Sequence, residues 1–183
     1  MNYPVYTVET APEAAKDTLT SAQKAYGFVP NMLGVMAKAP PVAAAYATLS
    51  KHFDETSLSP AERQTVLLTT SYENECEYCM AAHSAIASMQ KVPQDVISAI
   101  RTGAPITDTK LAALHRFTKA VVTSRGWPSA ADTAAFLGAG YGEQQVLEVL
   151  LGVSVKTLSN YTNSIANTPL DSAFGAVAWV KAA

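Results

Sequence analysis

Apolar residues recur at helical spacing through most of the chain. Tyr46, Leu49 and Phe53 stand at positions i, i+3 and i+7 of one segment, and this spacing places them on one face of a helix. Short runs with the alternating pattern of a strand are scarce. The pattern therefore predicts an all-α fold, which a chain of 183 residues forms as a single domain.

Helix start and stop signals divide the chain into segments. Thr10 with Glu13, and Ser59 with Glu62, fit capping boxes, Thr107 fits an N-cap, and Gly27 fits a helix end. Together with the prolines, these signals predict helices over approximately residues 10–26, 32–38, 42–55, 59–71, 75–90, 93–103, 107–126, 129–137 and 143–166.

The segment 143–166 is the longest predicted helix and is apolar on more than one face. Such a helix is buried, either within the subunit or in an oligomer. Only 15% of the residues are charged, so we expect a homo-oligomer rather than a free monomer. The tail after Pro169 carries Phe174 and Trp179 and is expected to dock on the helices.

Composition excludes several classes of protein. The net charge is −2 and no basic cluster is present, which argues against nucleic-acid binding. The sequence shows neither the pattern of a signal peptide nor an apolar run of about 18 residues, so we expect a cytoplasmic protein that does not cross a membrane. Two cysteines in one C-x-x-C motif indicate redox or metal chemistry in that compartment.

The C-x-x-C motif is followed by a histidine at a spacing that fits one helical site. With Asn74 as N-cap and Glu77 reaching back to it, Cys76 would lie in the first turn and Cys79 at the start of the second. Cys76, Cys79 and His83 then fall within one sector of about 60°. Cys79 and His83 form an i, i+4 pair, so their side chains are expected to be neighbours.

This arrangement favours thiol redox chemistry, because a second thiol lets oxidation stop at a disulfide. The helix N-terminus and the imidazole favour a thiolate, whereas Glu75 and Glu77 act against it. Zinc binding by Cys76, Cys79 and His83, and a buried inert pair, are the alternatives. We expect no metal and no bound organic cofactor.

The segment Leu58-Ser59-Pro60-Ala61-Glu62-Arg63, followed by Cys76-Glu77-Tyr78-Cys79 and His83, resembles the AhpD-like alkylhydroperoxidase branch of the carboxymuconolactone decarboxylase family. The resemblance covers roughly residues 40–125, with helical extensions on both sides, and the helix around 158–161 is similar to the tail of peroxidase-related members. It implies an AhpD-like helical bundle, a dimer, trimer or hexamer, and thiol-dependent reduction of hydroperoxides.

The resemblance also implies roles for individual residues. Cys79 would be the peroxidatic thiol, Cys76 the resolving thiol, and His83 the residue that passes or takes the proton. The glutamate that begins the family's proton relay is replaced by Gln64, so a nearby carboxylate, such as Glu73, could substitute for it.

Further positions are open between a site role and a structural one. Glu62 and Glu77 are the other carboxylates that could replace the relay glutamate. Tyr78 stands where some members carry a histidine, and it would either bind a peroxide oxygen or pack as an aromatic residue. Asn160, Tyr161 and Asn163 would either line the pocket or cap neighbouring helices.

The leading hypothesis is a peroxidase that reduces organic hydroperoxides through a Cys76–Cys79 disulfide. A dithiol donor, either a lipoyl group or a thioredoxin-like protein, would reduce this disulfide again. The alternatives are a thiol-disulfide oxidoreductase or redox sensor without efficient peroxide turnover, motivated by Gln64, and a structural oligomer with a vestigial site.

Overall fold

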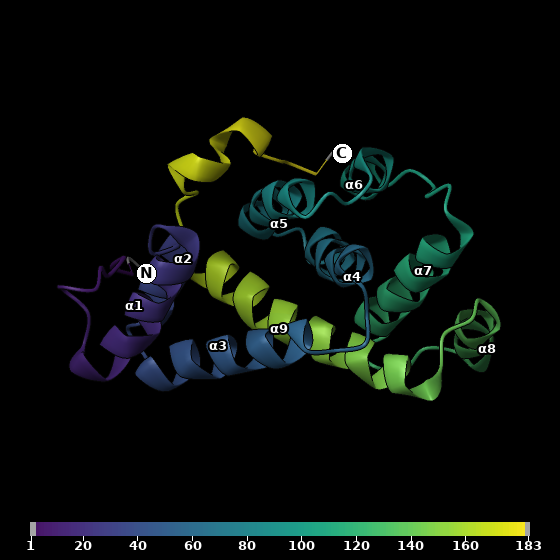
Figure 1. Ribbon diagram of the computed structural model, residues 1–183, viewed down its shortest axis with the longest axis horizontal. Helices are drawn as coiled ribbons and strands as arrows, with labels where there is room; N and C mark the ends of the chain where they lie inside the picture. Colours follow the sequence, from purple (N-terminus) through teal and green to yellow (C-terminus); the bar gives the residue numbers. More distant parts are fainter. Residues whose placement is uncertain (1–2, 182–183) are drawn as a thin grey trace.

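The computed structural model describes residues 3–181 and is all-helical over them. Figure 1 shows the arrangement of the helices, and their bounds follow in chain order. They are α1 (Glu13–Tyr26), α2 (Asn31–Met36), α3 (Pro40–Asp54), α4 (Pro60–Glu73), α5 (Glu77–Met89), α6 (Gln94–Thr102), α7 (Thr109–Thr123), α8 (Ala130–Gly138), α9 (Glu143–Ala166) and the 3₁₀ helix η1 (Ser172–Val177). The predicted all-α fold is confirmed.

Helix α4 lies at the centre and packs against α5, α6, α7 and α9 (Figure 1). Every residue from Gln64 to Ser71 is buried. Thr65, Thr70 and Ser71 return their hydroxyls to carbonyl oxygens of their own helix, which satisfies these groups without water. The predicted capping box of Ser59 and Glu62 starts this helix.

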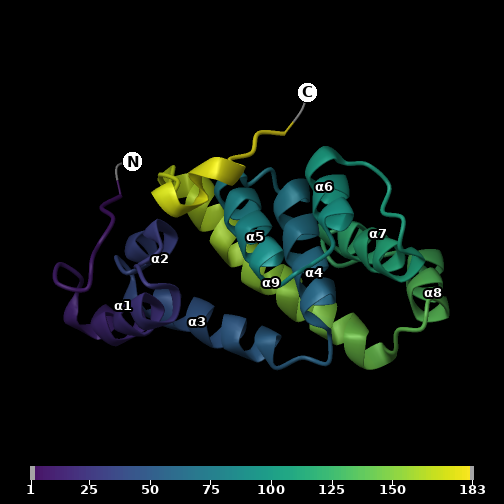
Figure 2. The ribbon, with the colours of Figure 1, turned by 45° about the horizontal axis from the view of Figure 1, so that its top comes forward.

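Helix α9 contacts α3, α4 and α5. In Figures 1 and 2, α4 and α5 lie above it and α3 lies to its lower left. Gly152 permits the close approach at the middle of α9. A Cβ atom at this position would lie 2.7 Å from both the Phe53 ring and a methyl group of Val66. The long helix therefore holds α3 and α4 at a distance that only glycine allows.

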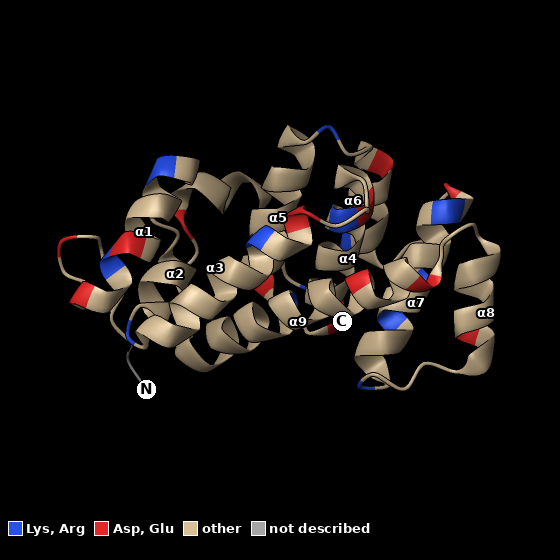
Figure 3. Ribbon diagram, turned by 60° about the horizontal axis from the view of Figure 1, so that its bottom comes forward, with Lys and Arg blue, Asp and Glu red and all other residues tan. Residues whose placement is uncertain are grey.

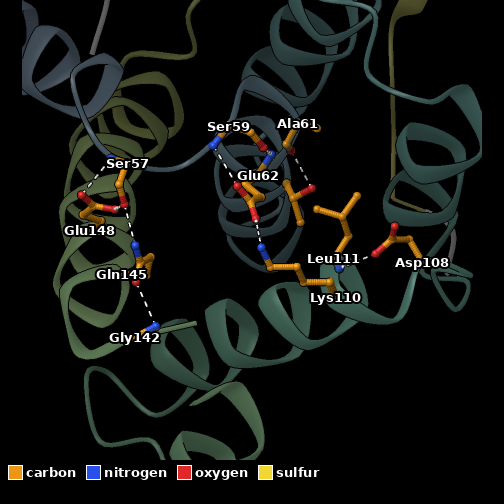
Figure 4. A network of polar contacts seen from close by, with 11 residues as sticks. Ser57, Ser59, Ala61, Glu62, Asp108, Lys110, Leu111, Gly142, Gln145 and Glu148 are labelled. Carbon is orange, nitrogen blue, oxygen red and sulfur yellow. Dashed lines mark hydrogen bonds and ion pairs between the residues drawn. The ribbon is translucent and has the colours of Figure 1, made fainter. Parts of the chain in front are cut away.

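A polar network fixes the loop that leads into α4 (Figure 4). Ser57 donates from its backbone N–H and its hydroxyl to the Glu148 carboxylate, at 2.9 and 2.7 Å. Gln145 donates to the Ser57 hydroxyl. Glu62, which accepts from the Ser59 N–H, also pairs with Lys110 on α7 at 3.2 Å. Glu62 therefore serves the start of α4 and not a proton relay.

The buried apolar residues form two clusters. One surrounds α4, α6, α7 and the N-terminal half of α9. The other joins α1, α2 and α5 to Phe174 of the tail, and it contains both cysteines. Phe174 and Trp179 are both buried, so the predicted docking of the tail is confirmed. The tail lies across α5 and ends beside α6 (Figure 2).

Two predicted helix starts differ from the structure. Thr10 does not cap α1: its hydroxyl accepts from the Thr7 N–H in a preceding turn, and Pro12 occupies the N-cap position. Thr107 does not cap α7, because its hydroxyl donates to Asp95 and Asp108 accepts from the helix instead. In both cases the threonine hydroxyl bonds to a competing partner nearby, so another residue takes the N-cap position.

Charged residues are spread thinly over the ribbon, with acidic and basic positions interspersed (Figure 3). Within the described part of the chain, no helix combines the length and hydropathy that crossing a membrane requires. Helix α9 nevertheless leaves apolar side chains in solvent, of which Leu147 and Ile165 are 67% and 65% exposed. The expectation that α9 is buried therefore holds for one face of this subunit only.

Candidate active site

The turn between α4 and α5 places the cysteines. Glu75 adopts a left-handed conformation with φ of 54°, and the N–H groups of Glu75 and Cys76 donate to the carbonyls of Tyr72 and Ser71. This pattern is a Schellman motif, here without its usual glycine. It ends α4 and makes Cys76 the N-cap of α5.

The predicted N-cap role of Asn74 is therefore wrong. Asn74 is the C-cap of α4, and its side chain donates to Asn160 on α9 at 3.0 Å. Cys76 consequently stands at the N-cap rather than in the first turn, and Cys79 is the third residue of α5. Both sulfurs thus lie nearer to the free N–H groups of the helix start than expected.

One amide group of α9 contacts both sulfurs. Asn163 Nδ2 donates to Cys79 Sγ at 3.2 Å and to Cys76 Sγ at 3.8 Å, and Ser159 Oγ lies 3.8 Å from Cys79 Sγ. Cys76 is 6% exposed and Cys79 is 1% exposed, and both are free thiols. The two sulfurs therefore face the same helix, from which polar groups are supplied to both.

His83 belongs to a chain of hydrogen bonds that passes through Lys156. His83 Nδ1 donates to Gln64 Oε1 at 3.0 Å, and Gln64 Nε2 donates to Gln90 Oε1 at 3.1 Å. His83 Nε2 then accepts from Lys156 Nζ at 2.9 Å. Because Gln64 Oε1 can only accept, these contacts define a neutral ring with its proton on Nδ1.

The electrostatics of the site favour a thiolate on Cys79. Burial acts to raise the pKa of Cys79, but a hydrogen bond from Cys76 and the Lys156 ammonium lower it to about 5. The pKa of Cys76 is raised by its hydrogen bond to Cys79 and by burial. Cys76 is therefore a thiol that donates to a Cys79 thiolate.

The pKa values of His83 and Lys156 are shifted in opposite directions. Burial and the neighbouring Lys156 charge hold the pKa of His83 well below its usual value. Burial opposes the charge of Lys156, yet the Cys79 thiolate raises its pKa. At neutral pH the site accordingly contains a thiolate–ammonium pair beside a neutral imidazole.

A cavity of about 370 Å³ reaches Cys79, His83 and Lys156. Its walls come from α1, α2, α3, α5, α9 and the tail, and they are mostly apolar. The aromatic rings and methionines of the lining are Tyr26, Phe28, Met32, Tyr46, Tyr78, Met89 and Phe174. Cys79 borders this cavity and Cys76 does not, so the thiolate is the sulfur that a bound molecule would meet.

Tyr78 and Glu73, two of the residues predicted for the site, make contacts with other parts of the fold. Tyr78 donates to the Asp171 carboxylate of the tail and accepts from the Met32 N–H, so its hydroxyl is committed to the packing of α2 and the tail. Glu73 forms an ion pair with Lys119 on α7 at 3.0 Å.

The remaining candidates also divide between site and scaffold. Gln64 is the only proposed relay position that contacts His83, while the side chain of Glu77 is exposed. Asn163 contacts the sulfurs without lining the cavity, whereas Asn160 bonds to Asn74 and Ser71. Tyr161 is exposed on the outer side of α9.

Sequence reasoning missed Lys156 and Ser159. A signal for them exists: Lys156, Ser159 and Asn163 stand at i, i+3 and i+7 within an otherwise apolar helix, and Lys156 is its only charge after Glu148. Polar residues on one face of a buried helix indicate a surface that is functional or hydrogen-bonded.

The zinc alternative finds little support. Residues 3–181 hold no group of three His, Cys, Asp or Glu side chains suited to a metal ion. Lys156 also contacts His83 Nε2, the nitrogen that zinc would need.

The helical bundle has an AhpD-like fold, since it matches a solved AhpD core with a TM-score of 0.83. The model of the Carboxymuconolactone decarboxylase family matches residues 40–120. This segment of the chain therefore matches the family that the resemblance predicted. The comparison with curated proteins finds no match.

Solved structures share the fold over nearly the whole chain. An uncharacterized peroxidase-related protein with an AhpD core from Ralstonia eutropha JMP134 has 22% identity and a TM-score of 0.83, covering 94% of this chain and 93% of its own. The debrominase Bmp8, as a variant bound to 2,3,4-tribromopyrrole, has 19% identity and a TM-score of 0.80, covering 96% and 94%. A peroxidase-related protein from Silicibacter sp. TM1040 has 18% identity and a TM-score of 0.77, covering 89% and 87%.

Proposed function

We propose that the protein is a thiol-dependent peroxidase that reduces organic hydroperoxides, with Cys79 as the nucleophile and Cys76 as the resolving thiol. The observation that carries the proposal is the position of Cys79: it borders the cavity, its pKa is lowered to about 5, and a second thiol donates a hydrogen bond to it. A thiolate, rather than a thiol, is the reactive nucleophile.

The proposed reaction has two steps within the protein. The Cys79 thiolate attacks the terminal oxygen of ROOH, the O–O bond breaks, and the alkoxide takes a proton to become ROH. Cys76 then attacks the sulfenic acid on Cys79, which releases water and leaves a Cys76–Cys79 disulfide. An external dithiol transfers two electrons and two protons and becomes a disulfide itself, which restores both thiols.

The surroundings support the proposed substrate and donor classes. An apolar, ring-lined cavity favours an organic hydroperoxide over hydrogen peroxide, because burial of the organic group contributes to binding. The sulfurs of Cys76 and Cys79 are too deeply buried for direct contact with a folded donor protein. A slender dithiol on a flexible arm, such as a lipoyl group, therefore fits better than a thioredoxin-like protein.

Intact-mass analysis after one equivalent of cumene hydroperoxide tests the proposal. The wild type is expected to lose two hydrogens, Cys76→Ser to gain one oxygen on Cys79, and Cys79→Ser to stay unchanged. Steady-state consumption with dihydrolipoamide should follow in the wild type alone. Disulfide exchange with negligible hydroperoxide consumption would instead favour the redox sensor, which the neutral Gln64 beside His83 supports.

Reductive removal of a halogen from an aromatic ring is the second candidate. The cavity is lined by aromatic rings, and a debrominase has the same fold. In this reaction the Cys79 thiolate would take the halogen, the ring carbon would take a proton, and Cys76 would displace halide to form the disulfide. Bromide release from tribromopyrrole under reducing conditions, compared with hydroperoxide consumption, separates the two functions.

We also propose that the active form is a homo-oligomer joined along α9. Leu147, Leu150, Tyr161 and Ile165 are exposed on this helix, and an apolar groove of about 710 Å³ lies beside its C-terminal half without reaching either cysteine. Light scattering of the wild type and of Leu150→Glu tests this: a monomeric wild type would contradict the proposal.

A further inference from the structure

Lys156 is a buried cation without a carboxylate partner among the described residues. Its side chain is 1% exposed, and the ion pairs of residues 3–181 do not include it. The titratable groups around it are the phenols of Tyr26 and Tyr46, the thiols of Cys76 and Cys79, and the ring of His83.

Of these groups, only Cys79 is an anion at neutral pH. An unpaired buried ion costs several kcal/mol, so the charge of Lys156 depends on the thiolate of Cys79. Loss of that thiolate would leave the ammonium with neutral neighbours only. The protonation of Lys156 is thereby tied to the chemical state of one sulfur atom.

His83 is in the wrong state to donate the proton that the reaction consumes. Its Nδ1 proton is held by Gln64 Oε1, and its Nε2 lone pair accepts from Lys156. A neutral imidazole with this tautomer can orient the lysine, but it presents no proton to the cavity. The ammonium of Lys156, which borders the cavity together with Cys79, does.

We propose that Lys156 is the general acid of this site, and that its proton leaves when the thiolate of Cys79 is consumed. The inference rests on the proposed peroxidase function. Cys79–S⁻, Lys156–NH₃⁺ and ROOH give Cys79–SOH, Lys156–NH₂ and ROH: the thiolate attacks the terminal OH, and the alkoxide takes the lysine proton. The ion pair disappears in one step, so no unpaired charge is left in the interior.

Neutral Lys156 also transfers protons in the next two steps, which are formation of the disulfide and its reduction by a dithiol. Lys156–NH₂ takes the proton of Cys76, whose thiolate attacks the sulfenic acid, and returns this proton to the departing hydroxide, which leaves as water. When a dithiol reduces the disulfide, the proton released at Cys79 goes back to Lys156 and the thiolate–ammonium pair forms again. The two charges of the site therefore appear and disappear together.

NMR titration of Lys156 tests this coupling without any hydroperoxide. Selective labelling of lysine, with the signal assigned through Lys156→Met, reports the charge of the amine as a function of pH. In the reduced wild type Lys156 should stay charged throughout the range in which exposed lysines are charged, because the Cys79 thiolate raises its pKa. In Cys79→Ser, and in the wild type oxidised to the disulfide, its pKa should fall by about three units or more, as for other buried lysines.

A comparison of two oxidants tests the role as acid. Cumene hydroperoxide releases a basic alkoxide that needs a proton, whereas peracetic acid releases a carboxylate that does not. Both react with the same thiolate, so the ratio of their single-turnover rates is independent of the thiolate fraction. Lys156→Met should lower the ratio of the cumene hydroperoxide rate to the peracetic acid rate by about 100-fold or more.

Two further variants complete the design. Lys156→Arg keeps a cation but cannot release its proton, so it should retain fast alkylation of Cys79 while its rate ratio falls. Lys51→Met, at a lysine whose side chain is 75% exposed, should match the wild type.

An unshifted lysine pKa in Cys79→Ser, or an unchanged ratio in Lys156→Met, would overturn the proposal. If the wild type reacts with peracetic acid but not with cumene hydroperoxide, the peroxidase function fails. The titration of Lys156 still decides the coupling in that case.

Discussion

Gln64 Oε1 accepts a hydrogen bond from His83 Nδ1 across 3.0 Å. This contact places a neutral amide at the position for which the resemblance implies a relay carboxylate. It also explains why the ring stays neutral: the amide fixes the tautomer but adds no negative charge, and burial together with Lys156 keeps the pKa of His83 low. Gln64 therefore fixes the tautomer of a neutral ring.

Gln64→Glu is expected to raise the pKa of His83, because a carboxylate within hydrogen-bond distance favours the imidazolium. Gln90 can rotate its amide to donate to the new carboxylate, so the fold should tolerate the change. NMR titration of the ring measures the shift, and hydroperoxide kinetics should show a greater contribution from His83. Gln90→Glu is the matched control, because it adds the same charge to a residue that bonds to Gln64 rather than to the ring. An equal shift of the His83 pKa in this variant would contradict a direct effect of position 64.

Alkylation of Cys79 should follow a pKa of about 5. We expect the rate of iodoacetamide modification to rise between about pH 4 and 6 and then to level off, because the thiolate is the reacting form. Lys156→Met should move the midpoint upward by more than one unit, since the favourable charge is lost. A wild-type midpoint near 8.5 would show an ordinary thiol and contradict the electrostatic description.

The same ionisation links folding stability to pH. The pKa of Cys79 is lower in the folded protein than in the unfolded chain, where it is about 8.5. Its contribution to the free energy of unfolding is therefore complete above that value and lost as the pH falls towards 5. Urea unfolding of the reduced protein should show stability that increases between pH 5 and 8. The increase should be smaller in Cys79→Ser.

Tyr78→Phe should destabilise the fold while leaving the chemistry of Cys79 intact. The phenol links the Met32 N–H to the Asp171 carboxylate, and its removal leaves buried polar groups without a partner, at a cost of about 1–3 kcal/mol. Urea unfolding measures the loss. The alkylation rate of Cys79 should stay within about twofold of the wild type, well below the roughly 10²–10⁴-fold effect of a group that acts as acid or base in a reaction. A loss of hydroperoxide reduction with unchanged stability would instead support a role for Tyr78 in substrate binding.

Gly152→Ala tests the close approach of α9 to α3 and α4. The added methyl group would lie 2.7 Å from Phe53 and Val66, and such overpacking costs about 1–3 kcal/mol. Gly138→Ala is the control, because a Cβ there meets no atom within 4 Å and alanine is the better helix former, by about 1 kcal/mol. The two variants should therefore change the free energy of unfolding in opposite directions, and destabilisation by both would show that packing at Gly152 is not the cause.

Local signals predicted the helices where no competing partner was present. The capping box at Ser59 forms as expected, since a serine followed three residues later by an acid satisfies two N–H groups at the helix start reciprocally. The same logic failed at Asn74, where an equally local pattern lost to a hydrogen bond with Asn160, 86 residues away in the chain. Spacing alone does not reveal that competitor.

The sequence by itself determined the all-helical fold and the C-x-x-C-x-x-x-H stripe, because helical periodicity and residue identity are local properties. The tertiary structure alone decided the chemistry of the stripe. Helix α9 brings Lys156 to His83 and Asn163 to the sulfurs from more than 70 residues away. The charge of Lys156 lowers the pKa of Cys79 and thereby favours its ionisation. Electrostatic effects depend on distance and burial, which the order of residues in the chain does not contain.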